Sequence, residues 1–425
     1  MRRIAVIGTG IAGSFVAHRL HPHCDVSVYE GDTRPGGHAH TVNIVLDGET
    51  IAVDTGFIVY NEETYPGLTS LFDTLDVATQ PTDMGFGVRS ESNGLEYSSR
   101  NLRGMFAQPL NLLSPRFWSI WRDFFRFRTA AFGYLKQNPD DLDTTLGEFV
   151  DSGRYGTPFQ KYLLYAMGGA IWSTEPSHMR DFPLTAYLRF MSNHRMLDPS
   201  GQPQWRTVVG GSREYVQKLT APFRDRIRLR ARVHALVRRA DCVEVHAEGQ
   251  PVERFDEVVV ATHSDQALAM LDNATSAERA VLGAIRYQPN DAVLHTDRSM
   301  LPRSQAARAA WNMHLPANDR DVVSVTYDMN ILQALDTRHS VCVTLNRTDE
   351  IDPDLIHGQF RYDHPQFDRA AIAAQRRWHE ISGVDRIHYA GAYWRFGFHE
   401  DGLWSGSRVA DAVLDSEKQG AAAHA

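Results

Sequence analysis

Three glycines and one acidic residue near the N-terminus have the types and spacing that bind a dinucleotide. Gly8, Gly10 and Gly13 form a G-x-G-x-x-G pattern, and Glu30 follows about 20 residues further on. The first glycine permits a tight turn, the second lets the backbone approach a pyrophosphate, and the third lets a helix pack closely on a strand. An acidic side chain at Glu30 accepts hydrogen bonds from the ribose hydroxyls and would repel the 2′-phosphate of NADP.

The elements expected around these residues occur in the order that such a site needs. Residues 4–7 form an apolar run typical of a buried parallel strand, residues 14–20 are predicted to be a helix, and residues 26–29 a second strand. The N-terminus of that helix offers N–H groups and partial positive charge to a phosphate. A second glycine pair, Gly36-Gly37, favours FAD over NAD, because a further turn there lets the chain lie against a longer cofactor.

Bulk composition limits the fold and excludes some functions. The 425 residues exceed the ~250–300 at which one core stops growing, which predicts two lobes. The net charge of -8 argues against a nucleic-acid binder. The 3 cysteines are isolated and the 19 histidines lack metal-ligand spacing, so we expect free thiols and no metal site. No apolar stretch approaches the ~20 residues of a spanning helix, which predicts a cytoplasmic protein that can touch the inner face of the membrane.

Further segments resemble the superfamily of flavin amine oxidases, protoporphyrinogen oxidases and phytoene desaturases. Residues 34–38, Arg-Pro-Gly-Gly-His, are similar to the R-x-G-G-R turn of that superfamily, with His38 where many relatives have arginine. The other segments that carry the resemblance are 53–58, 205–212, 258–262, 387–394 and 397–406.

The resemblance implies an α/β fold in which a Rossmann-type FAD-binding domain of the amine oxidase kind carries an inserted α+β substrate domain. The expected bounds are 1–75, 204–265 and 376–416 for the FAD-binding domain, 76–203 and 266–375 for the substrate domain, and 417–425 for a disordered tail. With the N-terminal motif, the resemblance also implies the FAD-binding residues, which are Gly8, Gly10, Ile11, Ala12, Gly13, Glu30, Gly31, Gly36, Gly37, His38, Thr55, Gly56, Phe57, Ile58, Val233, Thr262, Gly391, Glu400, Asp401, Gly402, Leu403 and Ser405.

The chemistry expected of such a site is the removal of two hydrogens from a substrate, one of them as a hydride that passes to the flavin N5. His399, Glu400 and Tyr393 adjoin the expected flavin turn and are candidate catalytic residues, with packing against the cofactor as the alternative. The candidate walls of the substrate pocket are Tyr60, Trp172 and Trp394.

Three segments resemble one branch of the superfamily more closely, namely 54–61, 391–394 and 397–402. That branch holds bacterial FAD oxidoreductases encoded beside cyclopropane-fatty-acid-synthase-like methyltransferases, and it includes the methylvaccenate desaturase of furan fatty acid synthesis. The resemblance implies a methyl-branched or unsaturated fatty acyl chain of a membrane lipid as the substrate. It implies a methyltransferase or an oxygenase as pathway partners.

Several alternatives stay open on the sequence alone. A strict amine oxidase needs an aromatic cage and a lysine near the flavin, whereas the only late lysine is Lys418. A flavin-dependent isomerase or a non-catalytic flavin protein that presents lipid to another enzyme are further hypotheses. Residues 115–135 interleave aromatic residues with arginines, which fits either an amphipathic helix on an anionic bilayer or a cap helix packed on the core.

Overall fold

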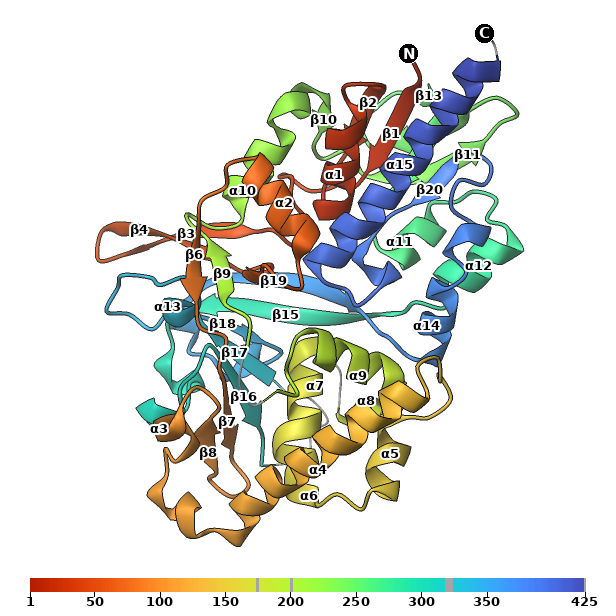
Figure 1. Cartoon of the computed structure of the whole chain (residues 1–425). Helices are drawn as coiled ribbons and strands as arrows, with labels where there is room; N and C mark the ends of the chain where they lie inside the picture. The colour runs from red at the N-terminus through yellow and green to blue at the C-terminus, as the bar shows by residue number, and fades with distance from the viewer. Residues whose placement is uncertain (173–175, 199–201, 318–323, 424–425) are drawn as a thin grey trace.

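The computed structural model describes residues 1–172, 176–198, 202–317 and 324–423. Two lobes are stacked along the long axis of the molecule (Figure 1). The first lobe, at the top of the figure, holds both chain termini and a parallel sheet, and the second holds a mixed sheet and a group of helices. In these described ranges, no helix has the length and apolar character needed to span a membrane.

A five-stranded parallel sheet forms the centre of the first lobe. Its order is β10-β2-β1-β14-β20, with bounds Ile227–Arg228, Asp25–Tyr29, Arg3–Ile7, Glu257–Val260 and Ile387–Tyr389. Ile4 and Val6 pack on one face with helices α1 (Ile11–Leu20) and α15 (His399–Ala423), and Ala5 packs on the other face. Both faces are therefore covered, which explains the continuous apolar runs of these strands. Helix α1 begins three residues before the predicted 14–20.

In the described part of the chain, three smaller sheets lie between or beside the two lobes. The bounds of their strands are β3 Thr41–Leu46 and β4 Glu49–Asp54 in a hairpin, β5 Val59–Asn61, β9 Trp205–Val208 and β6 Thr79–Thr82 in a second sheet, and β11 Val233–Arg238, β12 Val243–Ala247 and β13 Glu253–Phe255 in a third. The neighbouring helices are α2 (Pro66–Thr74), α10 (Arg213–Thr220), α11 (Ser264–Ala269), α12 (Ser276–Leu282) and α14 (Arg369–Gln375).

A seven-stranded mixed sheet forms one side of the second lobe. Its order is β19-β15-β18-β17-β16-β7-β8, with bounds Ile356–Pro365, Tyr287–His295, Cys342–Leu345, Ser324–Asp328, Trp311–Leu315, Phe86–Ser90 and Glu96–Ser98. Strands β7 and β16 pair in parallel and join the two inserted segments of the chain in one sheet. Both insertions therefore contribute strands to one sheet.

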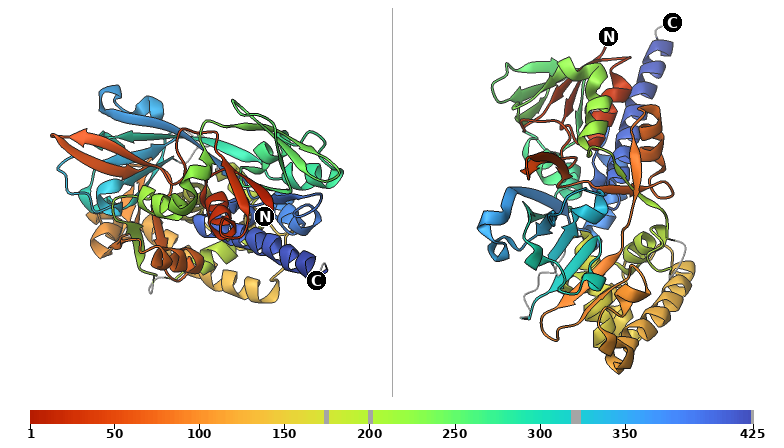
Figure 2. Two further views of the ribbon diagram at one scale, coloured as in Figure 1. Left: turned by 90° about the horizontal axis from the view of Figure 1, so that it is seen from above. Right: turned by 90° about the vertical axis from the view of Figure 1, so that its left-hand side faces the viewer.

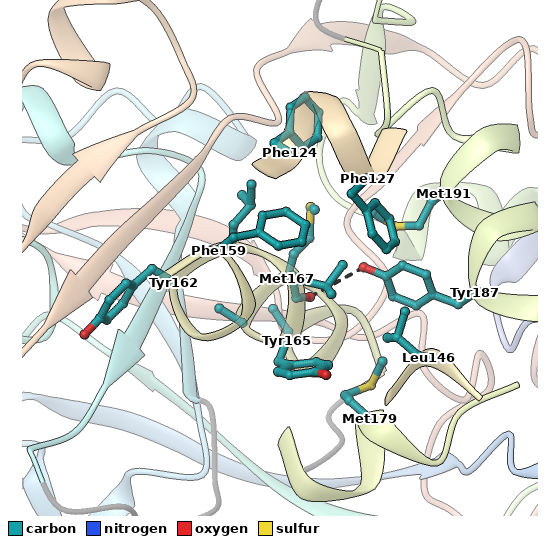
Figure 3. Close-up of a cluster of buried hydrophobic side chains, with 14 of the residues drawn as sticks. Phe124, Phe127, Leu146, Phe159, Tyr162, Tyr165, Met167, Met179, Tyr187 and Met191 are labelled. Atoms are coloured by element: carbon teal, nitrogen blue, oxygen red, sulfur yellow. Dashed lines mark hydrogen bonds between the residues drawn. The ribbon is translucent and has the colours of Figure 1, made fainter. Parts of the chain in front are cut away.

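Helices α4 to α9 form the other side of the second lobe. Their bounds are Pro115–Gln137, Leu146–Ser152, Thr157–Phe159, Tyr165–Trp172, Pro176–Arg180 and Leu184–Asn193. Helix α4 begins at the Ser114 cap, whose hydroxyl accepts the Phe117 N–H at 3.2 Å. Figure 3 shows Phe124 and Phe127 of α4 among the aromatic and methionine side chains of the neighbouring helices, and the Tyr187 hydroxyl donates to the Leu164 carbonyl at 3.4 Å. One face of α4 is thus packed on the core.

The structure shifts some of the expected boundaries. Val281, Leu282 and Ile285 lie in the same hydrophobic cluster as the parallel sheet, so the chain leaves the FAD-binding domain near residue 285 and not at residue 265. Strand β6 pairs with β9, which places part of the first insertion beside the FAD-binding domain. Helix α15 continues to Ala423, where the sequence predicted a disordered tail from residue 417. These contacts join segments far apart in sequence, which local patterns do not report.

Candidate functional site

A cavity of about 420 Å³ lies where the carboxyl ends of the parallel strands meet the substrate domain. Gly8, Glu30, Thr262 and Gly391 follow four of these strands and line one side, and Trp172 is among the side chains that line the other. Ligands of open parallel sheets bind at this edge. The cavity is therefore the candidate site for the cofactor and the substrate together.

Two of the motif glycines are required by contacts within the protein. Gly8 has a φ of +98°, and a Cβ there would lie 2.7 Å from the carbonyl oxygen of Ala261. A Cβ on Gly13 would lie 2.0 Å from the carbonyl oxygen of Gly8. Gly13 does not line the cavity, so its role is to let α1 approach the turn.

Gly10 is required for a different reason. Apart from its chain neighbours, no described residue has a heavy atom within 4 Å of the position of a Cβ on Gly10. Gly10 is also the N-cap of α1, and no side chain caps this helix. Gly10, Ile11 and Ala12 line the cavity, so the open position and the helix N–H groups are left for an anionic ligand. This geometry fits the pyrophosphate of FAD.

Glu30 lies beside this turn and is held by backbone donors. The Thr9 N–H donates to Oε2 at 2.9 Å and the Asp32 N–H to Oε1 at 2.8 Å, and the Thr9 hydroxyl also bonds this carboxylate. A carboxylate has about four acceptor positions. Glu30 can therefore accept ribose hydroxyls while the backbone fixes its orientation.

The second glycine turn packs directly on the first. Gly36 and Gly37 have positive φ values of +116° and +56°, and a Cβ on Gly37 would lie 3.0 Å from the Cα of Gly10. The Gly36 N–H donates to the Thr9 carbonyl at 3.1 Å. The Arg34 guanidinium donates to the carbonyls of Gly37 at 2.8 Å and Ala39 at 3.2 Å. Arg34 thus stabilises the turn.

Residues 55–58 line the cavity at the end of β4. A Cβ on Gly56 would lie 2.2 Å from the His38 carbonyl oxygen, which also accepts the Phe57 N–H at 2.8 Å. The preceding Asp54 is buried, and its carboxylate accepts the Ser212 N–H at 2.9 Å and the Ser212 hydroxyl at 2.8 Å. These bonds fix the cavity wall to the 205–212 segment.

The first turn of α15 closes the same side of the cavity. Gly402 lines it, and a Cβ there would lie 2.8 Å from Cγ2 of Ile11. The Ser405 hydroxyl donates to the Gly402 carbonyl at 3.0 Å and accepts the Gly391 N–H at 2.8 Å. The Asp401 carboxylate accepts the Phe398 N–H at 2.9 Å, and burial raises the pKa of this carboxyl to about 7. Asp401 and Ser405 support the turn from behind and do not line the cavity.

The three candidate catalytic residues have different positions. Glu400 does not reach the cavity, because its carboxylate accepts the N–H groups of Gly67 and Leu68, each at 2.9 Å, at the start of α2. His399 lines the cavity and stacks on Phe57 with ring centroids 3.7 Å apart. Burial lowers the pKa of His399 to about 3, so this imidazole is neutral.

Tyr393 also lines the cavity, and burial raises the pKa of its phenol, so it too is uncharged. The His399 Nε2 lies 2.7 Å from the Tyr215 hydroxyl. His399 and Tyr393 therefore contribute neutral aromatic walls to the cavity.

Several predicted site residues lie away from the cavity. The predicted FAD-binding residues that do not line the cavity are Gly13, Gly31, Gly36, Val233, Glu400, Asp401, Leu403 and Ser405. Val233 and Leu403 are packed in the hydrophobic core. Tyr60 packs edge-to-face on Phe72 at 5.1 Å, and Trp394 packs against Tyr393 at 4.9 Å, so neither is a pocket wall. Trp172 does line the cavity.

A histidine cluster lines the cavity around His38, and two of its members were not predicted from the sequence. His364 lies 5.9 Å and His263 6.1 Å from His38 between ring centroids. Burial lowers the pKa of all three, to about 4 for His364. His263 directly follows Thr262 at the carboxyl end of β14, and this position is a signal that could have identified it as a site residue. Nothing in the sequence around His364 identifies that histidine as a site residue.

The cavity wall away from the glycine turns is largely apolar and aromatic. Its side chains include Met84, Ile171, Trp172, Phe190, Met196, Trp205, Trp311, Tyr327, Phe367, Phe396 and Phe398. Phe190 and Phe398 stack with centroids 4.9 Å apart, and Trp172 lies 4.7 Å from Phe190. This wall suits an apolar molecule.

Comparisons with known proteins agree with this architecture. The sequence matches the family described as flavin containing amine oxidoreductase over residues 11–316. A comparison with curated protein sequences found no match. The fold is similar to that of putrescine oxidase bound to putrescine, at 14% identity and a TM-score of 0.70, covering 97% of this chain and 99% of that chain.

Two further solved structures share the fold. Cyclohexylamine oxidase from Brevibacterium oxydans IH-35A is 16% identical with a TM-score of 0.68, covering 98% of this chain and 99% of that chain. A CLA-producing fatty acid isomerase from P. acnes is 15% identical with a TM-score of 0.69, covering 97% of this chain and 98% of that chain. The match covers most of the chain, and Gly10 leaves space for a pyrophosphate. The chain therefore belongs to the flavin-containing amine oxidoreductase family and is an FAD-dependent oxidoreductase.

Proposed function

We propose that this enzyme desaturates a methyl-branched or unsaturated fatty acyl chain of a membrane lipid. The apolar wall of the cavity carries the proposal. A buried cationic amine is usually paired with an anionic side chain. Among the described lining residues, the acidic side chains are Glu30 and Asp363. Backbone donors hold Glu30, and Asp363 accepts the Nε–H of Arg361 at 3.1 Å, which favours an uncharged acyl chain.

Each side of the cavity has a distinct part in this reaction. When bound, FAD would supply the two-electron acceptor that desaturation needs. The second hydrogen leaves as a proton, so one C=C bond replaces two C–H bonds. The neutral imidazoles of His38, His263 and His364 lie together in the cavity and can take up that proton. The aromatic wall orients the acyl chain and excludes water.

Anaerobic reduction of the flavin tests the proposal. The purified protein with bound FAD is mixed with a phospholipid that carries a methyl-branched unsaturated chain, dispersed in detergent micelles. We expect the visible absorbance of the oxidised flavin to bleach and mass spectrometry to find an acyl product lighter by two hydrogens. Putrescine and cyclohexylamine are the comparison substrates. Bleaching by either amine and none by the lipid would contradict the proposal.

A fatty acid isomerase is the second candidate function. The apolar cavity favours it over a diamine oxidase, whereas the fold is equally similar to the isomerase from P. acnes and to putrescine oxidase and does not distinguish them. An isomerase would move a double bond with no change in product mass and no net bleaching of the flavin. A non-catalytic flavin protein would give neither product. In the desaturase proposal, a methyltransferase supplies the branched substrate and an oxygenase uses the product.

A further inference from the structure

Exposed apolar side chains are concentrated at one end of the second lobe. Of the twelve large hydrophobic side chains exposed in the described ranges, half lie between residues 102 and 125. These six, which we call the apolar tip, are Leu102, Leu110, Leu112, Leu113, Trp118 and Phe125. Leu110 is 78% exposed and Leu113 is 82% exposed. Single exposed hydrophobic residues are ordinary on a soluble protein, whereas a group of this kind marks an interaction surface.

Hydrogen bonds hold the apolar tip in a defined shape. Its leucines lie on helix α3 (Leu102–Met105) and on the 3₁₀ turn Pro109–Leu113, which leads into α4. The Asn101 side chain caps α3 by accepting the Gly104 N–H at 2.8 Å. The Trp118 indole N–H donates to the Leu112 carbonyl at 2.9 Å and so ties the turn to α4. The apolar groups are therefore presented on an ordered surface.

Basic side chains surround the apolar tip. Residues 99–137 contain six arginines, one lysine and a single acid, Asp123, in a chain with a net charge of -8. Two of these arginines pair with acids outside the segment, Arg100 with Asp83 at 2.8 Å and Arg128 with Asp198 at 2.9 Å, and an excess of positive charge remains. Asp123 is buried and accepts hydrogen bonds from Arg126 at 2.9 Å and from the Gly156 N–H at 2.8 Å. On α4, Trp118, Arg122 and Phe125 share one exposed face at helical spacing. The surface is thus both apolar and cationic.

The apolar tip lies at the end of the molecule opposite the chain termini. Figure 1 and the right-hand view of Figure 2 both place the turn before α4 at the bottom of the second lobe. Helix α4 packs against α9, and α9 carries Phe190, which lines the cavity. The tip and the cavity wall therefore belong to the same helical group.

We propose that the apolar tip docks on an anionic lipid bilayer. The leucines and Trp118 would enter the boundary between headgroups and acyl chains, and the arginines would meet the lipid phosphates. This inference rests on the proposed function, since docking brings the enzyme to its lipid substrate. A second copy of the chain is a poorer occupant, because two surfaces that both carry an excess of positive charge repel each other across a twofold axis.

Sedimentation with vesicles tests the docking surface. The FAD-loaded protein is mixed with vesicles of phosphatidylcholine alone or with added phosphatidylglycerol. We expect binding to the anionic vesicles, and at least tenfold weaker binding for the Leu110→Ser/Leu113→Ser variant. Val45→Ser is the matched control, because Val45 is also exposed but lies on the β3–β4 hairpin. Raising the salt from about 0.1 M to about 1 M shortens the screening length from about 10 Å to about 3 Å and should weaken binding.

The outcomes separate this inference from the proposed function. Absence of wild-type binding to the anionic vesicles, or equal binding by the double variant, overturns the docking surface. A dimer in light scattering that the double variant converts to a monomer also overturns it, in favour of a second copy. Flavin reduction by lipid in detergent micelles needs no bilayer, so it should be unchanged in the double variant. If the lipid in micelles fails to reduce the flavin of the wild-type protein, this result contradicts the desaturase proposal alone.

Discussion

The Glu400 carboxylate accepts the backbone N–H of Gly67 at 2.9 Å, which joins the first turn of the C-terminal helix to the first turn of α2. The N-cap of α2 is Tyr65, whose side chain makes no capping bond, so Glu400 supplies this function from a distant part of the chain. A Cβ on Gly67 would lie 2.7 Å from Cδ2 of Leu403 and 2.9 Å from the Glu400 Oε1, so a larger residue here would displace these two side chains. This acid therefore stabilises the fold around the cavity without reaching into it.

Removing this cap should affect stability and spare the chemistry. We expect Glu400→Ala to lower the free energy of unfolding by about 2 kcal/mol, because two helix N–H groups lose a charged acceptor. Chemical denaturation measures this loss, and Glu400→Gln, which keeps one acceptor oxygen, should lose less. The rate of anaerobic flavin reduction should change by less than about twofold. A large decrease in the rate of flavin reduction at unchanged stability would indicate that Glu400 is a catalytic residue.

Gly10 and Gly13 should respond differently to the same substitution. Gly10→Ala adds a methyl group where the described protein leaves space, so we expect a stable apoprotein whose FAD affinity is at least about tenfold lower. Gly13→Ala places a methyl group 2.0 Å from the Gly8 carbonyl oxygen, so the apoprotein itself should unfold at lower temperature. Fluorescence titration with FAD and thermal unfolding measure the two effects. Equal FAD affinity in Gly10→Ala and wild type would show that no cofactor group approaches this glycine.

The dinucleotide motif could be predicted from the sequence because its parts are close together along the chain. Gly8, Gly13 and Glu30 act through a turn and through strands that local patterns already indicate. The opposite wall could not be predicted in this way. Trp172 lines the cavity and Trp394 is packed in the core, although both are buried aromatic residues in apolar segments. Tertiary packing alone distinguishes them.

The predicted domain boundary at residue 265 differs from the structure for a similar reason. The segment before residue 285 continues the chain after β14 and looks like the start of an insertion, yet its apolar residues pack on the parallel sheet. His364 reaches the cavity because β19 pairs with β15, a contact between distant segments. Sequence patterns report which residues are apolar, and they do not report which surface covers them.

Asp401 should make the stability of the protein depend on pH. Its folded pKa of about 7 lies above the ~4 of an unfolded aspartate, so the folded state binds the proton more tightly. This contribution is fully present below about pH 4 and is lost as the pH rises to about 7, a total on the order of 4 kcal/mol. Asp401→Asn cannot titrate. We therefore expect the variant to gain stability relative to wild type over this range, as measured by denaturant unfolding at several pH values.

Other titrating groups, including the buried histidines, are common to both proteins and cancel in this difference. Asparagine keeps an oxygen that can accept the Phe398 N–H, so the turn itself should be preserved. A difference in the free energy of unfolding that stays constant between about pH 4 and about pH 7 would contradict the raised pKa of Asp401.

His364 should control the proton that leaves the substrate. Because its pKa is about 4, the imidazole is neutral above about pH 5, and the rate of flavin reduction should fall only below that pH. We expect the His364→Gln variant, with FAD still bound, to reduce its flavin about 100-fold more slowly. Its rate of flavin reduction should also no longer fall below about pH 5. His295→Gln is the matched control, since His295 is also buried with a pKa of about 4 but bonds Thr344 outside the cavity. A wild-type rate in FAD-loaded His364→Gln would exclude this histidine as the proton acceptor.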